Sequence, residues 1–247
     1  MLRGVLTICA LALAVIPVTL SVVLFAALRL PHFTIDLCAR FFGRVGITCL
    51  GARLLPVLWH TNRATLAAQL VIVSNHESHV DPAALVLALK PRSVRFVAKE
   101  DLFHIPIFGW ALRAAGNIPV SRDHGGGDVN RLNDLTARRK DGDVLFFAEG
   151  SRGGTGVFRP FKKGAFAFAI THQRTILPVG IGGSFECLPP HSLRARPGPV
   201  AIVVGEPISV DGLTLDDRDA LRDRVQSIVG ELRTQALRLA GSPRAGA

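Results

Sequence analysis

The stretch Asn-His-Glu-Ser-His-Val-Asp at positions 75–81 directly follows the apolar run Leu-Val-Ile-Val at 70–73 and leads into Pro82. A short β-branched run that ends in a polar cluster is typical of a buried strand that delivers side chains to a site. Asp81 before Pro82 predicts a helix start, with Asp81 as N-cap and the proline at the first helical position. This stretch therefore predicts a strand, a polar turn and a helix in succession.

The same alternation of strand and helix patterns continues along the chain. We expect strands at 69–75, 93–98, 117–121, 143–148, 175–181 and 200–205, and helices at 82–90, 105–115, 127–140, 163–172 and 214–238. This rhythm predicts an α/β fold in which a mixed sheet is flanked by helices. The length of 247 residues suits one such domain at 56–240. An N-terminal element at 1–55 precedes it, and a tail at 241–247, expected to be disordered, follows it.

The N-terminal element is predicted to be embedded in a membrane. No charged residue lies between Arg3 and Arg29, and at about 1.5 Å per residue such a helix is long enough to cross a hydrocarbon core of about 30 Å. Pro17 lies near the middle, so a kinked or hairpin-like insertion is an alternative. The apolar stretch is longer than the region of roughly 7–15 residues found in cleaved signal peptides. We therefore expect a retained anchor.

An amphipathic helix is expected directly after the anchor. Phe33, Leu37 and Phe41 recur every four residues, with Arg40 and Arg44 between or beside them. This spacing is typical of a helix that lies in a membrane interface, and the alternative is a core helix with a solvated basic face. Because the basic segment follows the apolar stretch, we expect the domain to lie on the cytoplasmic side of the cytoplasmic membrane.

Composition narrows the classes of partner. Hydrophobic residues make up 49% of the chain, and the formal net charge is +10, which favours anionic partners such as phosphate groups or a lipid surface. Nucleic acid is not expected as a partner, because the chain has no basic helix, zinc-finger pattern or aromatic RNA platform. The four cysteines have neither the spacing of a metal site nor the density of a disulfide framework.

Three interpretations compete for His76 and Asp81. On a continuous helix, residues five apart lie about 140° from each other, but in a turn they can meet. The first interpretation is structural, with a helix cap and a loop histidine. The second makes His76, His79 and Asp81 metal ligands, although their spacing differs from that of the zinc-protease helix. The third is a general base without a metal, in which Asp81 fixes the imidazole tautomer.

Four blocks in order favour the third interpretation. Asn75-His76 followed four residues later by Asp81 resembles the first motif of the glycerolipid acyltransferases, the family of lysophosphatidic acid acyltransferases. The other three blocks resemble the later motifs of that family: Gly-Asn-Ile-Pro-Val-Ser-Arg at 116–122, Phe-Ala-Glu-Gly-Ser-Arg at 147–152, and Ile-Leu-Pro-Val at 176–179. Ala148 and Ser151 replace the proline and threonine that are usual in the third motif, and neither replacement removes a charge.

The resemblance implies an enzyme that transfers an acyl group to the free hydroxyl of lysophosphatidic acid, giving phosphatidic acid. The donor would be acyl-CoA or acyl carrier protein, without a metal or another cofactor. His76 would take the proton from the attacking hydroxyl, and Asp81 would orient His76 and stabilise the imidazolium.

The resemblance also implies a substrate-binding set. Arg122 and Arg152 are expected to bind the acceptor phosphate, and Gly150 permits a close backbone approach. Glu149 is expected to orient Arg152 or to contact a substrate hydroxyl. The set is completed by Lys162, which adds positive charge, and by Gly116, which opens the second block.

Three alternative functions stay open from the sequence. The enzyme would acylate another acceptor such as a lyso-ornithine lipid, or the protein would be a metal-dependent hydrolase or a non-catalytic protein that binds membranes.

Overall fold

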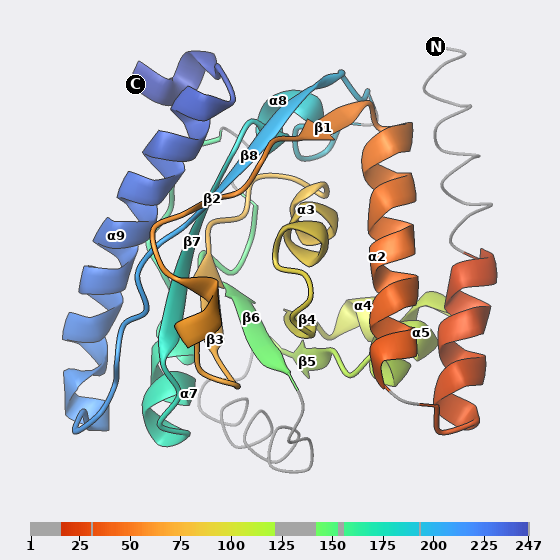
Figure 1. Cartoon of the computed structure of the whole chain (residues 1–247), viewed down its shortest axis with the longest axis horizontal. Coiled ribbons are helices and arrows are strands. Elements are labelled where there is room, and N and C mark those ends of the chain that lie inside the picture. The colour runs from red at the N-terminus through yellow and green to blue at the C-terminus, as the bar shows by residue number, and fades with distance from the viewer. Residues whose placement is uncertain (1–15, 31, 122–141, 153–155, 193, 247) are drawn as a thin grey trace.

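The computed structural model describes residues 16–30, 32–121, 142–152, 156–192 and 194–246 (Figure 1). Its centre is an eight-stranded sheet in the order β1-β8-β7-β3-β6-β4-β5, with β2 also paired to β8. The strands are β1 Ala52–Leu54, β2 Leu58–Trp59, β3 Val71–Ser74, β4 Val94–Lys99, β5 Ile118–Val120, β6 Asp143–Phe147, β7 Ile176–Gly182 and β8 Gly198–Val204. Only the β7–β8 pair among these is antiparallel. The expected mixed α/β sheet is confirmed.

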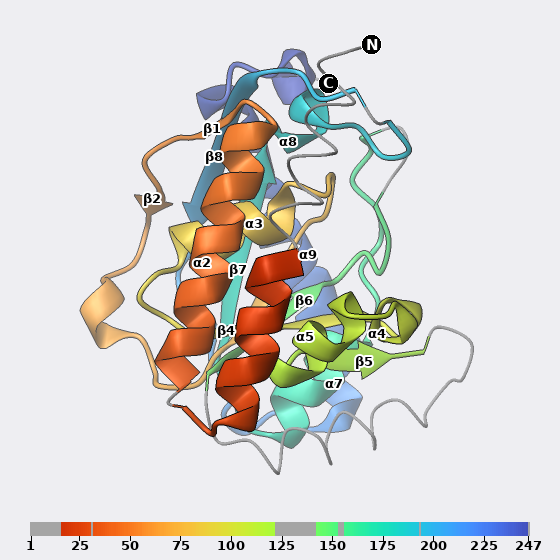
Figure 2. The same cartoon turned by 90° about the vertical axis from the view of Figure 1, so that its right-hand side faces the viewer.

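Helices cover both faces of this sheet (Figures 1 and 2). Their bounds are α2 His32–Cys49, α3 Asp81–Ala88, α4 Asp101–His104, α5 Phe108–Ala114, α7 Gly164–Thr171, α8 Ser184–Cys187 and α9 Arg218–Leu239, and a further helical segment lies at 16–27. Short 3-10 turns lie at Arg63–Thr65, Leu215–Asp217 and Pro243–Gly246. The expected helix at 127–140 lies outside the described residues.

The central strand β3 is buried on both faces because its side chains alternate between two cores. Ile72 packs in the core that contains Leu85 of α3, whereas Val71 and Val73 pack in the core that contains Phe166 of α7 and residues of α9. All four residues of β3 are buried, so the strand reads as a continuous apolar run rather than an alternating one. The residues that follow β3 are thereby carried to the carboxyl edge of the sheet.

The sequence did not predict every element. β1 and β2 are short and were missed, and β1 joins the sheet from within the range 1–55. The helix expected at 105–115 begins later, as α5 at Phe108, because Ile105 precedes a proline and adopts an extended conformation. The short helix α4 before it was not predicted. We also expected the tail at 241–247 to be disordered. Instead, Pro243–Gly246 forms a 3-10 turn that is held by hydrogen bonds from Arg244.

The apolar stripe predicted on α2 faces outward. Phe33, Leu37 and Phe41 are 67%, 61% and 58% exposed, and α2 packs on α3 through a different face that includes Gly43 and Ile47. The alternative of a core helix buried through this stripe is therefore wrong. Within the described part of the chain, none of the helices combines the length and apolarity that crossing a bilayer requires. Residues 1–15, which contain about half of the uncharged stretch, lie outside the described residues.

Candidate functional site

The candidate site lies where β3 ends, in the turn between β3 and α3. The Nδ1 atom of His76 is 2.8 Å from Oδ2 of Asp81, so the turn brings together the two side chains that the sequence pattern paired. The Asp81 side chain is fully buried, whereas 17% of the His76 side chain is exposed. The carboxylate fixes the proton on Nδ1, and the other ring nitrogen is then the one that can accept a proton.

Asp81 does not cap α3, in contrast to the sequence prediction. Val80 occupies the N-cap position, and the α3 helix begins at Asp81 without a side-chain cap. The carboxylate points back into the turn instead, where Oδ2 also accepts hydrogen bonds from the backbone N–H groups of Glu77 (2.7 Å) and Ser78 (2.8 Å). Three hydrogen bonds to one oxygen hold the turn around His76.

The His76 ring is also fixed from one of its faces. It stacks on Phe147 with ring centroids 3.9 Å apart and 15° between the ring planes. Phe147 ends β6, next to β3 in the sheet, and the sequence analysis gave it no role of its own. A rotation of the imidazole away from Asp81 would therefore lose both the stacking contact and the hydrogen bond.

Two further residues anchor the turn to the scaffold. The buried amide of Asn75 donates to the carbonyl of Ile181 and accepts from its N–H, at 3.0 and 2.8 Å. This pairing extends the contact between β3 and β7 past the end of β3. The Ser78 hydroxyl donates to the carbonyl of Leu188 (2.7 Å). Both residues therefore hold the turn.

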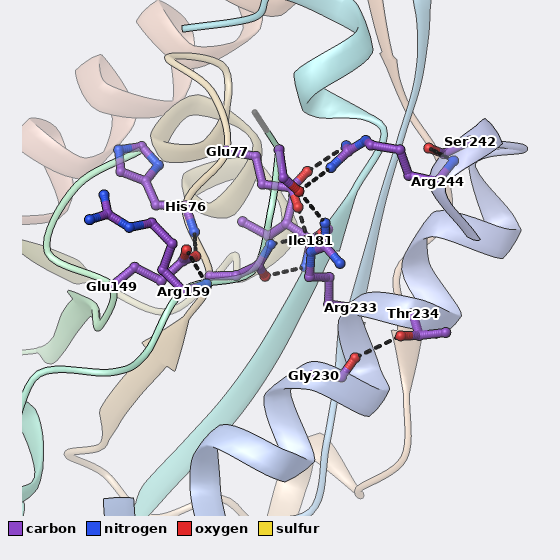
Figure 3. A network of polar contacts seen from close by, with 12 residues as sticks. His76, Glu77, Glu149, Arg159, Ile181, Gly230, Arg233, Thr234, Ser242 and Arg244 are labelled. Carbon is purple, nitrogen blue, oxygen red and sulfur yellow. Dashed lines mark hydrogen bonds and ion pairs between the residues drawn. The ribbon is translucent and has the colours of Figure 1, made fainter. Parts of the chain in front are cut away.

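Glu149 contacts the backbone of the site in a way that the sequence did not predict. Its Oε1 accepts the N–H of His76 (2.8 Å), and its Oε2 accepts the N–H of Arg159 (3.0 Å) (Figure 3). Burial raises the pKa of Glu149 to about 7, against the opposing effect of these two hydrogen bonds. Near neutral pH the carboxyl is thus partly protonated, which reduces negative charge beside the site.

Positively charged side chains lie around the turn that follows Glu149. Gly150 has a φ of +70°, and a Cβ there would come within 2.9 Å of the Lys162 side chain. Lys162 therefore lies directly over this turn. His79 is exposed, but desolvation of its ring still lowers its pKa, and the charge of Arg152 lowers it further, so Arg152 lies near His79. Arg159, which the sequence analysis missed, donates from Nη1 to the hydroxyl of Ser151 (2.6 Å).

The remaining predicted substrate residues do not join this cluster. Arg122 lies outside the described residues. Gly116 has a φ of +81° and donates its N–H to the carbonyl of Arg113 (3.0 Å), so the turn from α5 to β5 accounts for this glycine. It precedes β5, whereas His76 follows β3, and these strands run in the same direction. Gly116 therefore lies toward the opposite edge of the sheet.

The described residues contain no group of three or more His, Cys, Asp or Glu side chains arranged to hold a metal ion. His79, which the metal interpretation required beside His76 and Asp81, is exposed. The oxygen of Asp81 that faces the turn already accepts three hydrogen bonds. What the described residues form at this turn is an imidazole oriented by a carboxylate.

Comparisons with known proteins identify relatives of this chain. A family model described as "Acyltransferase" matches residues 57–182. A 1-acyl-sn-glycerol-3-phosphate acyltransferase alpha from Mus musculus is 33% identical over 174 residues, which are 68% of this chain and 61% of the mouse protein. The chloroplastic 1-acyl-sn-glycerol-3-phosphate acyltransferase BAT2 from Brassica napus is 34% identical over 140 residues, which are 56% of this chain and 40% of that protein.

A solved structure has the same fold. The 1-acyl-sn-glycerophosphate (LPA) acyltransferase PlsC from Thermotoga maritima superposes with a TM-score of 0.75 at 19% sequence identity, covering 93% of this chain and 92% of that chain. The curated relatives are longer, so this chain spans about 40% to 61% of the length of the two described above. The resemblance carried by the four sequence blocks is confirmed.

Proposed function

The chain belongs to the Acyltransferase family, and on that premise we propose that it acylates lysophosphatidic acid to give phosphatidic acid, with acyl-CoA or acyl carrier protein as the donor. The observation that carries this proposal is the hydrogen bond of 2.8 Å between His76 Nδ1 and the buried Asp81, at the carboxyl edge of the central strand. Ligand-binding residues of α/β sheets collect at this edge.

In the proposed reaction the acceptor hydroxyl attacks the carbonyl carbon of the donor thioester. His76 takes the hydroxyl proton on Nε2 as the new C–O bond forms, and the negative charge of Asp81 stabilises the imidazolium. The tetrahedral intermediate then collapses with cleavage of the C–S bond. The imidazolium returns its proton to the departing thiolate, so His76 is neutral again at the end of the cycle.

The acceptor phosphate would be bound by the positive cluster beside His76. Arg152, Arg159 and Lys162 contribute positive charge there, and guanidinium groups match phosphate oxygens with two parallel hydrogen bonds. Glu149 would not repel the phosphate strongly, because burial raises its pKa to about 7 and two backbone N–H groups bind its oxygens. Arg122 remains a predicted further phosphate ligand.

We further propose that the protein acts at the cytoplasmic surface of the cytoplasmic membrane. Exposed large apolar side chains of the described residues concentrate on the helical segment at 16–27 and just after it, on α2, and on or next to α4 and α5. These helices lie on the right of the molecule in Figure 1 and face the viewer in Figure 2. The side chains are those of Ile16, Leu20, Leu24, Leu28, Leu30, Phe33, Leu37, Phe41, Leu102, Ile105 and Trp110. Such a surface suits insertion into one leaflet. The net charge of +10 favours anionic lipids.

The test uses membranes that contain the wild type, His76→Ala or His79→Ala at equal expression. His79 is the matched control, because it is an exposed histidine of the same turn without a role in the reaction. Each membrane receives acyl-CoA or acyl carrier protein, with lysophosphatidic acid or lyso-ornithine lipid as acceptor. Phosphatidic acid formed by the wild type and His79→Ala, and lost in His76→Ala, supports the proposal. Product from lyso-ornithine lipid alone contradicts lysophosphatidic acid as the acceptor. The absence of product with both donors and both acceptors contradicts the proposed acyl transfer.

A further inference from the structure

Glu77, next to the proposed base, receives two arginines from the far end of the chain. Its side chain is buried, with 4% of the residue exposed. Arg233 of α9 donates from Nε to Oε1 (2.5 Å), and Arg244 of the C-terminal turn donates from Nη2 to Oε2 (2.8 Å). The partners are 156 and 167 residues away in sequence. Both oxygens of one carboxylate in the catalytic turn are thus bound by the C-terminal segment (Figure 3).

The same two arginines also bind the segment between Arg152 and Arg159. Nη2 of Arg233 and Nη1 of Arg244 donate to the carbonyl of Gly156, at 2.8 and 2.9 Å. Gly156 has a φ of +71°, and a Cβ at this position would come within 2.8 Å of Arg244 Nη1. The absence of a side chain therefore lets the guanidinium approach the backbone directly.

Arg244 is itself held in place by residues of α8. Its Nε and Nη2 donate to the two oxygens of Glu186, at 2.8 and 3.0 Å. Its guanidinium carbon lies 4.6 Å from the centre of the Phe185 ring, within the range of a cation–π contact. Every nitrogen of the Arg244 guanidinium thus has an acceptor, and the planar fork fixes the direction of each bond.

Two separate links therefore join the turn that carries His76 to the segment with the proposed phosphate ligands. Glu149 joins the backbone N–H groups of His76 and Arg159. The arginine pair joins the carboxylate of Glu77 to the carbonyl of Gly156. A single link leaves one loop free to rotate about it, whereas two links at different residues fix both the separation and the orientation.

We propose that Arg233 and Arg244 are positioning residues that set the distance and orientation between the His76 base and the phosphate-binding segment. Neither arginine needs to touch the substrate for this role. An error of about 1 Å in the placement of a reacting group can reduce the rate about a hundredfold. The C-terminal helix and turn would thus determine how productively a bound acceptor meets His76. This inference rests on the proposed function.

The experiment compares Arg244→Met with Arg238→Met. Arg238 lies on the same helix as Arg233 but is exposed, so its loss removes the same charge without touching Glu77. Two kinds of measurement are made. Steady-state kinetics gives kcat and KM for lysophosphatidic acid, and hydrogen exchange is followed at the backbone amides of His76, Glu77, Ser78 and Arg159. We expect Arg244→Met to lower kcat by about tenfold or more and to accelerate exchange at these amides. We expect Arg238→Met to change neither kcat nor the exchange at these amides.

Two further variants separate positioning from charge and from folding. Arg244→Lys keeps the charge but not the fork, and we expect it to remain as impaired as Arg244→Met. Glu77→Gln keeps the shape of the side chain and weakens both arginine contacts. If Arg244→Met does not fold, kcat and amide exchange are measured in Glu77→Gln instead, with the same expected changes.

Normal kcat and exchange in Arg244→Met, or full rescue by Arg244→Lys, would overturn the inference. Inactivity of the wild type toward lysophosphatidic acid would contradict the proposed function instead. The exchange measurement needs no substrate, and it would still decide whether the arginines hold the two segments together.

Discussion

The imidazole of His76 stacks against the ring of Phe147, with centroids 3.9 Å apart, while Asp81 binds its Nδ1 atom. The stacking follows from sheet register, because Ser74 at the end of β3 pairs with Phe147 at the end of β6. One contact fixes the plane of the ring, and the other fixes its rotation within that plane. The imidazole is therefore oriented before any substrate binds.

We expect Phe147→Leu to reduce kcat by about tenfold, because the imidazole loses the surface that fixes its plane. KM for the acceptor changes little, since Phe147 is not among the proposed phosphate ligands. The matched control is Phe146→Leu, whose side chain packs in the opposite core against Phe168. That control lowers the thermal midpoint but keeps kcat near the wild-type value. An equal loss of kcat in both variants would argue against an orienting role for Phe147.

Asp81→Asn is expected to reduce kcat by about a hundredfold or more. The amide cannot stabilise an imidazolium as a carboxylate does, and its NH₂ group repels a donor wherever it replaces an accepting oxygen. The measurement is single-turnover acyl transfer, with circular dichroism to verify folding. A well-folded Asp81→Asn protein with wild-type rates would rule out the proposed role of this carboxylate.

Glu149 makes the free energy of unfolding depend on pH. Burial raises its pKa in the folded protein from 4.5 to about 7, so between these values the folded state binds more protons than the unfolded state. The contribution is therefore present in full below about pH 4.5 and is lost as the pH rises through about 7. It is worth about 3 kcal/mol in total. Urea unfolding from pH 4.5 to 8 shows this loss in the wild type relative to Glu149→Gln. If the free energy of unfolding changes with pH in the same way in both proteins, the raised pKa of Glu149 is contradicted.

The ion pair between Arg92 and Asp143 is expected to stabilise the fold strongly. Nη2 of Arg92 lies 2.7 Å from Oδ1 of Asp143, and the Arg92 Nε atom binds the other oxygen. Asp143 is 1% exposed and also accepts the N–H of Leu70 at the entry to β3. Arg92→Met leaves this carboxylate buried without its cation, which costs about 3–5 kcal/mol.

Urea unfolding at constant pH measures this cost. Arg222→Met is the control, because Arg222 pairs with Asp223, whose side chain is 67% exposed, and we expect its loss to change the free energy of unfolding little. A similar loss of unfolding free energy in the two variants would show that the buried pair stabilises the fold no more than the exposed pair does.

The outward stripe of α2 is expected to carry membrane affinity. The triple variant Phe33→Asn, Leu37→Asn, Phe41→Asn removes three side chains that are each more than half exposed. Burying one such side chain is worth about 1.5–3 kcal/mol, so partitioning onto anionic vesicles falls by at least about a hundredfold. Vesicle flotation measures it, with Leu215→Asn, another exposed leucine, as control. Undiminished binding of the triple variant would contradict insertion through α2.

Helices and strands were predictable where the local sequence pattern matches the burial of the element in the fold. Each of the six expected strands is present within two residues of its expected bounds, because strands buried on both faces produce apolar runs that few other structures require. β1 and β2 escaped prediction because such short strands carry little pattern of their own. They become strands through pairing with β8.

The candidate site was predictable in its residue types and only partly in its contacts. The spacing of His76 and Asp81 indicated that a turn could join them, and the structure joins them. The same residues gave no sign that Asp81 would turn away from the helix start, or that Glu149 would bind the His76 backbone. Arg159, Arg233 and Arg244 belong to no short motif, so no local signal marked them.

The sequence by itself determined the strand, turn and helix around His76, the alternation that makes an α/β sheet, and the family resemblance of the four blocks. These depend on residue type and near-neighbour spacing, which act through backbone preference and burial. Only the tertiary structure decided which distant groups meet: Phe147 against His76, Glu149 between two loops, and the C-terminal arginines on Glu77. Those contacts depend on strand order and helix packing, because residues more than 70 positions apart meet only after the sheet has assembled.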